Sequence, residues 1–443
     1  MRAPGDGPLT MAVGVLGAGA LGLSCALELA RAGESVVVLE KEPVPGGLAA
    51  GFPVGDAYLE RFYHHLFRTD TTITALIHEL GLGDALTWGR PNTSVLHQGE
   101  RYALDSPAAV LGFRPLPVLD RLRLGAAAGY LKLVRDYRHL PDTTAADWLR
   151  RRMGARGYAT VWEPQLRGKF GAHAEDIALP WFWARIHCRT PELGYLRGGF
   201  HQLYTRLAEA ITALGGRVEL GREVQGIARE PDGRLCVDTP QGPYHFDRLA
   251  VTLPTRLFLR LARGLPDDYR ARWERGPLHL GAHCVVLALD RPLMPPVYWL
   301  SVTDPGFPFL AVVEHTNFLP AADYGGRHLV YLGNYLPMEH ELFTWDDARV
   351  LGEFLPHLRK LNPAFGPGWV REHWVWKAPY AQPVVTRGYL RQLPPHETPL
   401  PGVYLANMAH VYPQDRGQNY SVRLGARLAR RVLASRASTA AEG

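Results

Sequence analysis

The sequence predicts an α/β fold in which a parallel sheet is combined with a second, α+β domain that contains an antiparallel sheet. Three observations lead to this prediction. An apolar strand-like stretch, a glycine-rich turn and a helical pattern follow one another between residues 12 and 33. Helical and alternating strand-like patterns occupy separate blocks further along the chain. The 443 residues exceed what one hydrophobic core usually serves, so we expect two intertwined or consecutive domains.

The composition is that of a folded protein, with 47% hydrophobic and 21% charged residues. The net charge of +6 is spread along the chain without a block of like charges, so nucleic acid is not an expected partner. The cysteines lie far apart and form no C-x-x-C pair, which predicts neither a metal site nor disulfides and favours a cytoplasmic location. They are Cys25, Cys188, Cys236 and Cys284.

The apolar stretch 13–33 is long enough to be considered as a membrane span or an export signal. Its five glycines and the charge of Glu28 argue against a span. The residues before it carry one basic group, Arg2, which argues against a signal peptide. We therefore interpret the stretch as part of the folded domain.

A strand from Ala12, "AVGVLG", is followed by the spacing Gly17-x-Gly19-x-x-Gly22 and by a helix that ends at Gly33. In a Rossmann-like unit the first glycine permits a tight bend and the second lets the backbone approach a pyrophosphate. The third allows close packing of helix and strand. This order of elements predicts a dinucleotide-binding domain.

The helix begins at Ala20 and Leu21, where free N–H groups face the expected phosphates. A second strand, "SVVVLE", ends in Glu40 about twenty residues after the glycines, where a carboxylate binds the hydroxyls of an adenosine ribose. Lys41 follows at the same edge. These residues fit either FAD or NAD.

A glycine doublet, Gly46 and Gly47, stands six residues after Glu40 and is followed by Leu48. This extension resembles the FAD fingerprint of the superfamily that contains FAD-dependent amine oxidases, protoporphyrinogen oxidases and phytoene desaturases. The resemblance implies FAD rather than NAD, with the doublet near the pyrophosphate and the flavin.

Three further segments resemble the same superfamily, so the likeness extends over most of the chain. They are 194–230, the strand-like "FDRLAVTLPT" that ends at Thr255, and 401–433. The resemblance implies that Val224 contacts the adenine and that the last helix directs its N-terminus at the flavin. The residues implied near the flavin are Asn407, Asn419, Tyr420, Ser421 and Val422. Asn407 and Met408 depart from the family's Gly-Glu pair, and no cysteine lies in this region, so non-covalent FAD is expected.

The resemblance also implies a discontinuous FAD-binding domain of the GR2 type, with a substrate-binding domain inserted in it. We assign residues 11–75, 193–258 and 395–435 to the FAD-binding domain. Residues 76–192 and 259–394 are assigned to the substrate-binding domain. The first substrate-domain block has helical patterns, and the second has runs such as "HCVVLALD" and "HLVYLGNYL" that predict an antiparallel sheet.

The candidates for substrate contact or proton transfer are Tyr63, His64 and His65, in a segment that skirts the flavin in the superfamily, and His410 near the C-terminus. Histidine titrates near neutrality, so it suits proton transfer that accompanies loss of a hydride. If the segment is a strand, His64 and His65 face opposite ways, and at most one faces the flavin.

The inserted domain is rich in aromatic residues, which form either a pocket or an ordinary core. Arg185, His187 and Lys377 are candidate anchors for an anionic group, and Asp415 and Arg416 are expected to form an ion pair. A basic helical pattern at 122–137 is either a solvated face or a surface for peripheral contact with an acidic membrane.

These observations predict an FAD-dependent oxidoreductase that removes a hydride from a C–N or C–C bond of a small organic substrate. Oxygen, a quinone or another carrier is the expected electron acceptor. No second G-x-G-x-x-G motif is present, so a domain for NAD(P)H is not expected. The alternative is a non-redox flavoenzyme similar to UDP-galactopyranose mutase that acts on a nucleotide sugar, and a flavin-bearing module without catalysis is a third class.

Overall fold

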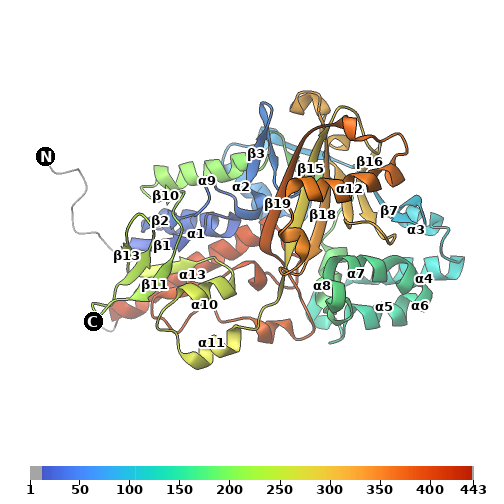
Figure 1. Cartoon of the computed structure of the whole chain (residues 1–443). Helices are drawn as coiled ribbons and strands as arrows, with labels where there is room; N and C mark the ends of the chain where they lie inside the picture. The colour runs from blue at the N-terminus through green and yellow to red at the C-terminus, as the bar shows by residue number, and fades with distance from the viewer. Residues whose placement is uncertain (1–11, 105, 442–443) are drawn as a thin grey trace.

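The computed structural model describes residues 12–104 and 106–441 and has two large sheets with a separate group of helices (Figure 1). Met11, the first residue of the predicted FAD-binding domain, lies outside the described residues. The α/β fold class, with a parallel sheet and an antiparallel one, is confirmed.

The first sheet is parallel and has five strands. Their spatial order is β10 (Arg217–Glu219), β2 (Ser35–Leu39), β1 (Ala12–Leu16), β14 (Arg248–Val251) and β20 (Val403–Leu405). The order changes direction beside β1, as in doubly wound sheets, where ligands bind outside the carboxyl ends of the strands. Strands from three distant stretches of the chain therefore meet in one sheet.

Helices cover one face of this sheet, and a small antiparallel sheet covers the other. The helices are α1 (Ala20–Arg31), α9 (His201–Ala213) and α13 (Gln418–Ala441). The small sheet consists of β11 (Gly226–Arg229), β12 (Leu235–Asp238) and β13 (Tyr244–Phe246), with α10 (Thr255–Leu261) and α11 (Asp267–Trp273) nearby. Val15 and Val38 pack into the helical core, whereas Leu16 and Leu39 pack into the core on the opposite face. This alternation explains why both strands are apolar except for the exposed Ser35 at the start of β2.

The second large sheet has seven strands and is antiparallel except where β7 pairs with β16. Its order is β19 (Val370–Pro383), β15 (His279–Leu289), β18 (His328–Leu336), β17 (Ala311–Glu314), β16 (Val297–Val302), β7 (Asn92–His97) and β8 (Glu100–Ala103). Helix α12 (Asp347–Leu361) packs against it through an apolar face that includes Val350, Phe354 and Leu358. The second inserted block supplies β15 to β19, whereas β7 and β8 come from the first inserted block, for which the sequence predicted helices.

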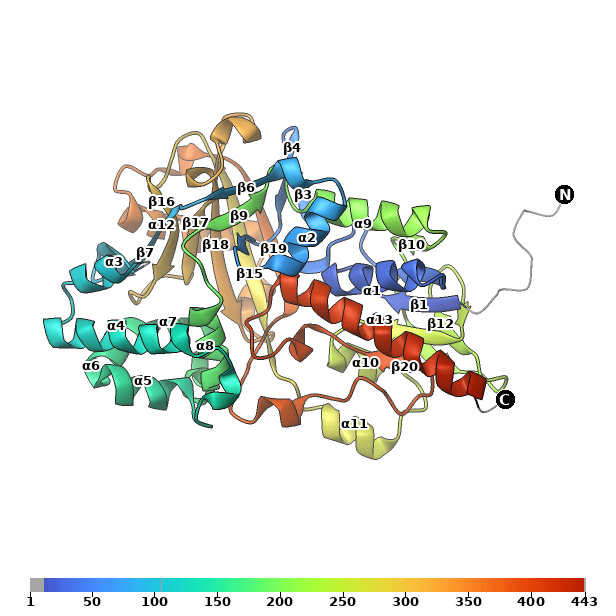
Figure 2. The same cartoon turned by 180° about the vertical axis from the view of Figure 1, so that it is seen from behind.

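A group of helices lies below one end of the seven-stranded sheet, away from β10 and β2 (Figure 2). It contains α4 (Val118–Leu133), α5 (Ala145–Met153), α6 (Ala155–Gly157), α7 (Glu163–Phe170) and α8 (Leu179–His187), with α3 (Pro107–Gly112) beside it. The remaining elements connect the two large sheets. They are the hairpin β3 (Gly51–Val54) and β4 (Ala57–Glu60), the sheet β5 (Leu66–Phe67), β9 (Leu193–Leu196) and β6 (Leu86–Gly89), and α2 (Thr71–Glu79).

Several sequence-derived limits differ from the observed elements. The domain limit at residue 75 falls inside α2, and the limit at residue 258 falls inside α10. The helix predicted to reach Tyr137 ends at Leu133. Trp183 Nε1 donates a hydrogen bond to the carbonyl oxygen of Val134 at 2.9 Å, so a tertiary contact satisfies the backbone where the helix stops.

The apolar stretch at 13–33 forms β1, the glycine turn and α1, which are largely buried in the doubly wound unit. Within residues 12–104 and 106–441, no helix has both the length and the apolar character to cross a membrane.

Candidate cofactor and substrate site

A cavity of about 820 Å³ runs from the glycine turn after β1 to the helices α7 and α8. Its volume lies within the range of roughly 300–1,000 Å³ that is usual for small-molecule sites. We call the part beside β1 and β2 the dinucleotide end and the part beside α7 and α8 the chamber end. The start of α13 lines the cavity between the two ends, and the segment between β4 and β5 lines it at the chamber end.

The glycine turn has no room for side chains. Gly17 has φ of +104°, a conformation that disfavours other residues. A Cβ atom on Gly22 would lie 1.9 Å from the carbonyl oxygen of Gly17, so the helix packs directly on the turn. Gly17, Gly19, Ala20 and Leu21 line the cavity, whereas Gly22 lies behind them. The N-terminus of α1 therefore faces the cavity without a covering side chain.

The glycine doublet is packed against this turn. Gly46 has φ of +118°, and its N–H donates to the carbonyl oxygen of Ala18 at 2.8 Å. A Cβ atom on Gly47 would lie 3.3 Å from Gly19 Cα. Gly46, Gly47 and Leu48 all line the cavity, so two distant glycine pairs form one backbone-lined cradle.

Glu40 lies at the carboxyl end of β2 and is 9% exposed. Its carboxylate accepts hydrogen bonds from the N–H groups of Ala18 at 2.8 Å and Glu42 at 3.0 Å. These bonds fix the carboxylate beside the glycine turn. Lys41 and Val224 also line the cavity at this end.

The first turn of α13 closes the middle of the cavity. Gln418, Tyr420 and Ser421 line it, and the buried Nε2 of Gln418 has no hydrogen-bond partner. The Oδ1 of Asn419 instead accepts a hydrogen bond from the N–H of Ile73 at 3.0 Å, and Val422 is buried in the core. Neither residue lines the cavity, which differs from the role that the resemblance implies for them.

Asn407 lines the cavity, but its side chain also has a structural role. Its Nδ2 donates to the carbonyl oxygen of Leu253 at 3.0 Å, and its Oδ1 accepts from the N–H of Ala409 at 3.1 Å.

The close approach of α13 to α1 explains the small residue at position 425, because a Cβ on Gly425 would lie 2.4 Å from the carbonyl oxygen of Leu21.

The residues at the dinucleotide end fit FAD. The glycine cradle and the N-terminus of α1 suit a pyrophosphate, and the Glu40 carboxylate suits a ribose. The unpartnered Nε2 of Gln418 and the positive end of the α13 dipole suit the electron-rich edge of a flavin. Each of these features is a backbone group or a fixed polar atom of the chain itself.

His64 and His65 both line the cavity, whereas the sequence led us to expect that at most one of them faces the flavin. That expectation assumed a strand, but the chain between β4 and β5 is irregular, so the alternation rule does not apply. The Nδ1 atom of His64 lies 2.6 Å from the carbonyl oxygen of Phe62 and donates to it, which leaves Nε2 as an acceptor. Burial lowers the pKa of His64 to about 4 and that of His65 to about 3, so both rings are neutral at pH 7.

Tyr63 lines the cavity, and its ring meets Trp299 edge-on with a centroid distance of 4.9 Å. His410 does not line it. The Nε2 of His410 lies 3.0 Å from the carbonyl oxygen of Pro394, and its Nδ1 lies 3.2 Å from the backbone nitrogen of Asn407. Both ring nitrogens therefore have structural partners, which leaves none for a substrate.

A cluster of cationic side chains lies at the chamber end around one carboxylate. Lys169 Nζ lies 2.9 Å and Arg185 Nη1 3.8 Å from Oδ2 of Asp415. The expected pair between Asp415 and Arg416 is not formed by their side chains, because Arg416 donates instead to Gln382 and Tyr335. Asp415 is held by the inserted helices, which sequence adjacency could not reveal.

Of the other anion anchors expected from the sequence, Lys377 lines the cavity, whereas His187 does not. The Nδ1 of His187 bonds the carbonyl oxygen of Lys132 at 3.1 Å. Sequence reasoning missed Lys169 and Arg189, which also line the chamber end. Arg185 lies in α8, whereas Arg189 follows the end of that helix at His187, so helical spacing does not account for their meeting at one cavity.

Sequence reasoning also missed Cys188, because only the C-terminal region was considered for covalent attachment. The structure brings this half-buried free thiol into the cavity lining near Tyr420. Burial raises the pKa of the thiol, which disfavours the nucleophilic thiolate.

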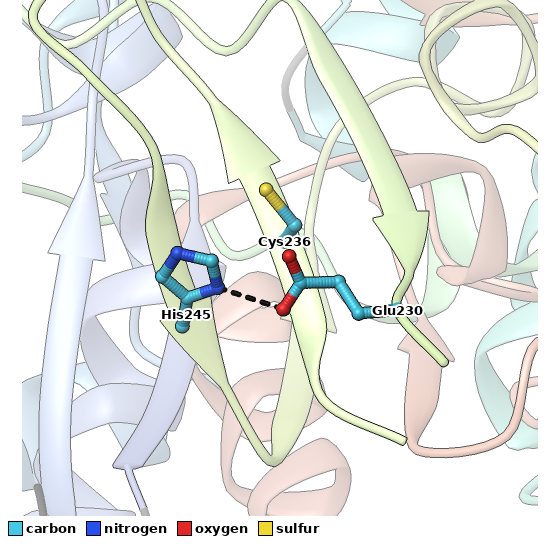
Figure 3. A group of neighbouring side chains, drawn as sticks. All are labelled: Glu230, Cys236 and His245. Carbon is cyan, nitrogen blue, oxygen red and sulfur yellow. Dashed lines mark hydrogen bonds and ion pairs between the residues drawn. The ribbon is translucent and has the colours of Figure 1, made fainter. Parts of the chain in front are cut away.

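Glu230, Cys236 and His245 gather on the small sheet away from the cavity (Figure 3). Their potential ligand atoms all lie within 4.8 Å of one another. Glu230 Oε2 lies 3.0 Å from His245 Nδ1 and 3.8 Å from Arg234 Nη2. The carboxylate therefore already has two partners, which account for its position without an ion.

Comparison with known proteins assigns this chain to a family. The model of the flavin-containing amine oxidoreductases matches residues 22–433. A Mycobacterium tuberculosis protein named as a flavin-containing monoamine oxidase, AofH, is 25% identical over 307 residues, which are 62% of this chain and 65% of that protein. The chain thus matches less than two thirds of the length of this curated relative.

Two crystal structures share the fold over nearly the whole chain. One is described as a protoporphyrinogen oxidase from Exiguobacterium sp. 255-15, with a TM-score of 0.76, 18% identity and coverage of 96% of this chain and 99% of that one. The other is a reduced UDP-galactopyranose mutase, with a TM-score of 0.75, 14% identity and coverage of 96% of both chains. Because the family model matches far more than half of its residues, this chain belongs to the flavin-containing amine oxidoreductase family.

Proposed function

We propose that the protein is an FAD-dependent oxidoreductase that removes a hydride from a C–N or C–C bond of a small organic substrate. The observation that carries this proposal is one cavity that joins a dinucleotide cradle to two neutral histidines. FAD, when bound, supplies the acceptor for the hydride. Gly17, Gly19 and Glu40 are the proposed contacts to its pyrophosphate and ribose.

His64 is the proposed group that holds or moves the substrate proton. Its Nδ1 is occupied by the carbonyl oxygen of Phe62, so Nε2 is the basic atom. The low pKa keeps Nε2 unprotonated at neutral pH, which suits a hydrogen-bond acceptor for a substrate N–H or O–H. His65 and Tyr63, beside it on the wall of the cavity, are the proposed groups that orient the substrate.

Non-covalent FAD is part of the proposal, and acid precipitation tests it. We expect the flavin to remain in solution while the protein precipitates. Flavin that stays with the pellet would show covalent attachment, and its release from a Cys188→Ser variant would identify the residue. The raised pKa of Cys188 supports the non-covalent form.

A second candidate is a non-redox flavoenzyme that acts on a nucleotide sugar. The cationic residues of the chamber end favour it, because such a substrate carries a diphosphate. Anaerobic incubation separates the two candidates. A substrate that bleaches the bound flavin by itself supports the oxidoreductase, whereas turnover that requires prior dithionite supports the second candidate.

Electrons are proposed to leave to oxygen, a quinone or another carrier, and to enter from the substrate rather than from NAD(P)H. We therefore expect NADH and NADPH to reduce the bound flavin no faster than free flavin. Saturable reduction by NADPH would contradict this part of the proposal.

The chain offers a surface for peripheral membrane contact on α3 and α4. The exposed large apolar side chains there are Leu111, Val118, Leu119, Leu122, Tyr130 and Leu133. Leu119, Leu122 and Leu133 recur at helical spacing on the side of α4 opposite the buried Leu124 and Leu131. Several nearby cations have internal partners, such as Lys132 with the carbonyl oxygen of Arg189, so we propose that apolar insertion dominates over charge.

Sedimentation with vesicles of phosphatidylcholine and phosphatidylglycerol tests this surface. We expect the double variant Leu119→Gln and Leu133→Gln to bind vesicles roughly tenfold more weakly than the wild-type protein. Leu214→Gln, at the exposed residue directly after α9, is the matched control. Wild-type protein that does not sediment with vesicles would contradict peripheral contact.

A further inference from the structure

The chamber end carries more positive than negative charge. Lys169 comes from α7, Arg185 from α8, Arg189 from the segment after α8, and Arg416 from the loop before α13. The carboxylate of Asp415 contacts two of them, Lys169 and Arg185. Even with that charge counted, the cations outnumber it, and like charges held side by side on one wall repel one another.

Asp415 cannot compensate a further cation, because its oxygens are already occupied. Oδ2 meets Lys169 and Arg185, as described above. Oδ1 accepts from Trp181 Nε1 at 3.2 Å, from Gln382 Nε2 at 3.3 Å and from the backbone N–H of Arg416 at 3.2 Å. The carboxylate therefore holds Lys169 and Arg185 in place, and its own hydrogen bonds keep it from moving towards a ligand.

Arg189 has no ion pair with a carboxylate in the part of the chain that the structure describes. Its guanidinium lies 5.7 Å from the ring centroid of Phe67 and is accessible from the cavity. Arg189 is exposed as a residue, and Arg185 places a second positive charge near its guanidinium. The guanidinium of such an arginine is stabilised most by an anion that accepts two parallel hydrogen bonds from it.

The walls beside these cations are apolar. Trp162 and Leu166 line the cavity from the α7 side, and Trp299 lines it from β16. A ligand that satisfies both features has an apolar body and one acidic end. A protonated amine would be repelled there by Arg185 and Arg189, and by Lys169 where it is protonated.

We propose that Lys169, Arg185 and Arg189 form a subsite for an anionic oxygen group of the substrate, either a carboxylate or a phosphate. The cavity then selects acidic apolar molecules and rejects protonated amines, although the family is named for amine oxidation. This inference rests on the proposed function, because it assigns the substrate class of the same cavity.

Four ligands with the same six-carbon chain test the inference by titration calorimetry on the FAD-loaded protein. They are hexanoate, hexyl phosphate, hexanamide and hexylamine. We expect at least one of the two anions to bind roughly a hundredfold more tightly than hexylamine. The two anions distinguish a carboxylate subsite from a phosphate subsite, and hexanamide measures the contribution of the chain.

Variants then assign the effect to the proposed residues. Arg189→Met should weaken binding of the preferred anion roughly tenfold to hundredfold and leave hexanamide binding unchanged. Arg189→Lys should restore part of the loss. The matched control is Arg167→Met, on the exposed side of α7, where Arg167 pairs with Glu163 at 2.9 Å.

Hexylamine that binds as tightly as both anions, or anion affinity that is unchanged in Arg189→Met, overturns the inference. If Arg189→Met folds poorly, the wild-type ligand series and Arg189→Lys still decide it. The FAD content of each preparation separates the two proposals. A protein that takes up no FAD overturns the proposed function, whereas a protein with stoichiometric FAD that prefers the amine overturns the subsite alone.

Discussion

The two ends of the cavity present different chemical groups. The dinucleotide end presents backbone N–H groups from glycine turns, with the Glu40 carboxylate fixed beside them by hydrogen bonds from Ala18 and Glu42. The chamber end presents side chains, among them His64, Lys169 and Arg189, which come from three separate segments. One end depends on the absence of side chains and the other on their charge.

This difference has a physical consequence for substitution. At the dinucleotide end a single added methyl group meets backbone atoms, as the 1.9 Å approach at Gly22 shows, so the geometry has almost no tolerance. At the chamber end a side chain can change its length or charge without displacing the backbone. Members of one family can therefore keep the cofactor end while the chamber end takes substrates of different charge.

The largest expected effect concerns the chamber end. In His64→Asn, flavin reduction by a substrate found in an anaerobic screen should slow by ~10²–10⁴-fold, because the basic Nε2 is lost while the glycine cradle is intact. Stopped-flow absorbance measures the rate, and the flavin spectrum measures retained FAD. His410→Asn is the comparison, and we expect it to affect thermal stability rather than this rate. Equal rates in wild type and His64→Asn would remove His64 from the chemistry.

The next effect concerns the dinucleotide end. Glu40→Gln should weaken FAD binding roughly tenfold to hundredfold, since a hydrogen bond to a charged group is worth about 1.5–3 kcal/mol. Fluorescence titration of apoprotein with FAD measures it, with Glu209→Gln on the surface of α9 as control. Unchanged affinity would mean that Glu40 serves only to brace the glycine turn.

A smaller effect, on stability, tests the backbone geometry of the dinucleotide end separately from the charge of Glu40. Gly22→Ala should lower the free energy of unfolding by about 1–3 kcal/mol, because the new Cβ overlaps the carbonyl oxygen of Gly17. Gly125→Ala is the matched control, since nothing lies within 4 Å of a Cβ there and alanine favours the interior of α4. Urea unfolding of both variants measures the difference, and equal stabilities would contradict the tight packing of the turn.

The smallest effect is a pH dependence at the chamber end. Burial lowers the pKa of Lys169 to about 7, so its positive charge is present below that pH and is lost above it. Asp70, which also lines the cavity and whose pKa burial raises to about 6, becomes negative over the lower part of the range. Both changes oppose an anion, so hexanoate affinity should fall severalfold between pH 6 and 8.

The other groups at the chamber end do not titrate in this window. His64 and His65 have pKa values of about 4 and 3, and the surrounding cations hold the pKa of Asp415 well below its usual range despite its burial. Lys169→Gln should therefore flatten the upper part of the profile. An unchanged profile in that variant would show that Lys169 is not the titrating group.

The sequence by itself determined the dinucleotide end. The positions of Gly17, Gly19, Gly22 and Glu40 fix backbone geometry within a few turns of chain, so local spacing was sufficient to predict the turn, the helix and the strand that follow it. The alternating runs that form β15, β17 and β18 were equally readable, because the period of a strand is set by its own residues.

Only the tertiary structure decided the chamber end and the limits of the regular elements. The sequence paired Asp415 with Arg416, but folding brings Lys169, 246 positions away, to within 2.9 Å of that carboxylate. The alternation rule for His64 and His65 assumed a strand, but the chain between β4 and β5 is irregular, and both histidines line the cavity. The sequence also contained no sign that Cys188 lies near Tyr420 or that His410 is enclosed by backbone groups. Spacing along the chain records local geometry, whereas contacts between distant side chains depend on how helices and sheets pack, and no local pattern encodes that packing.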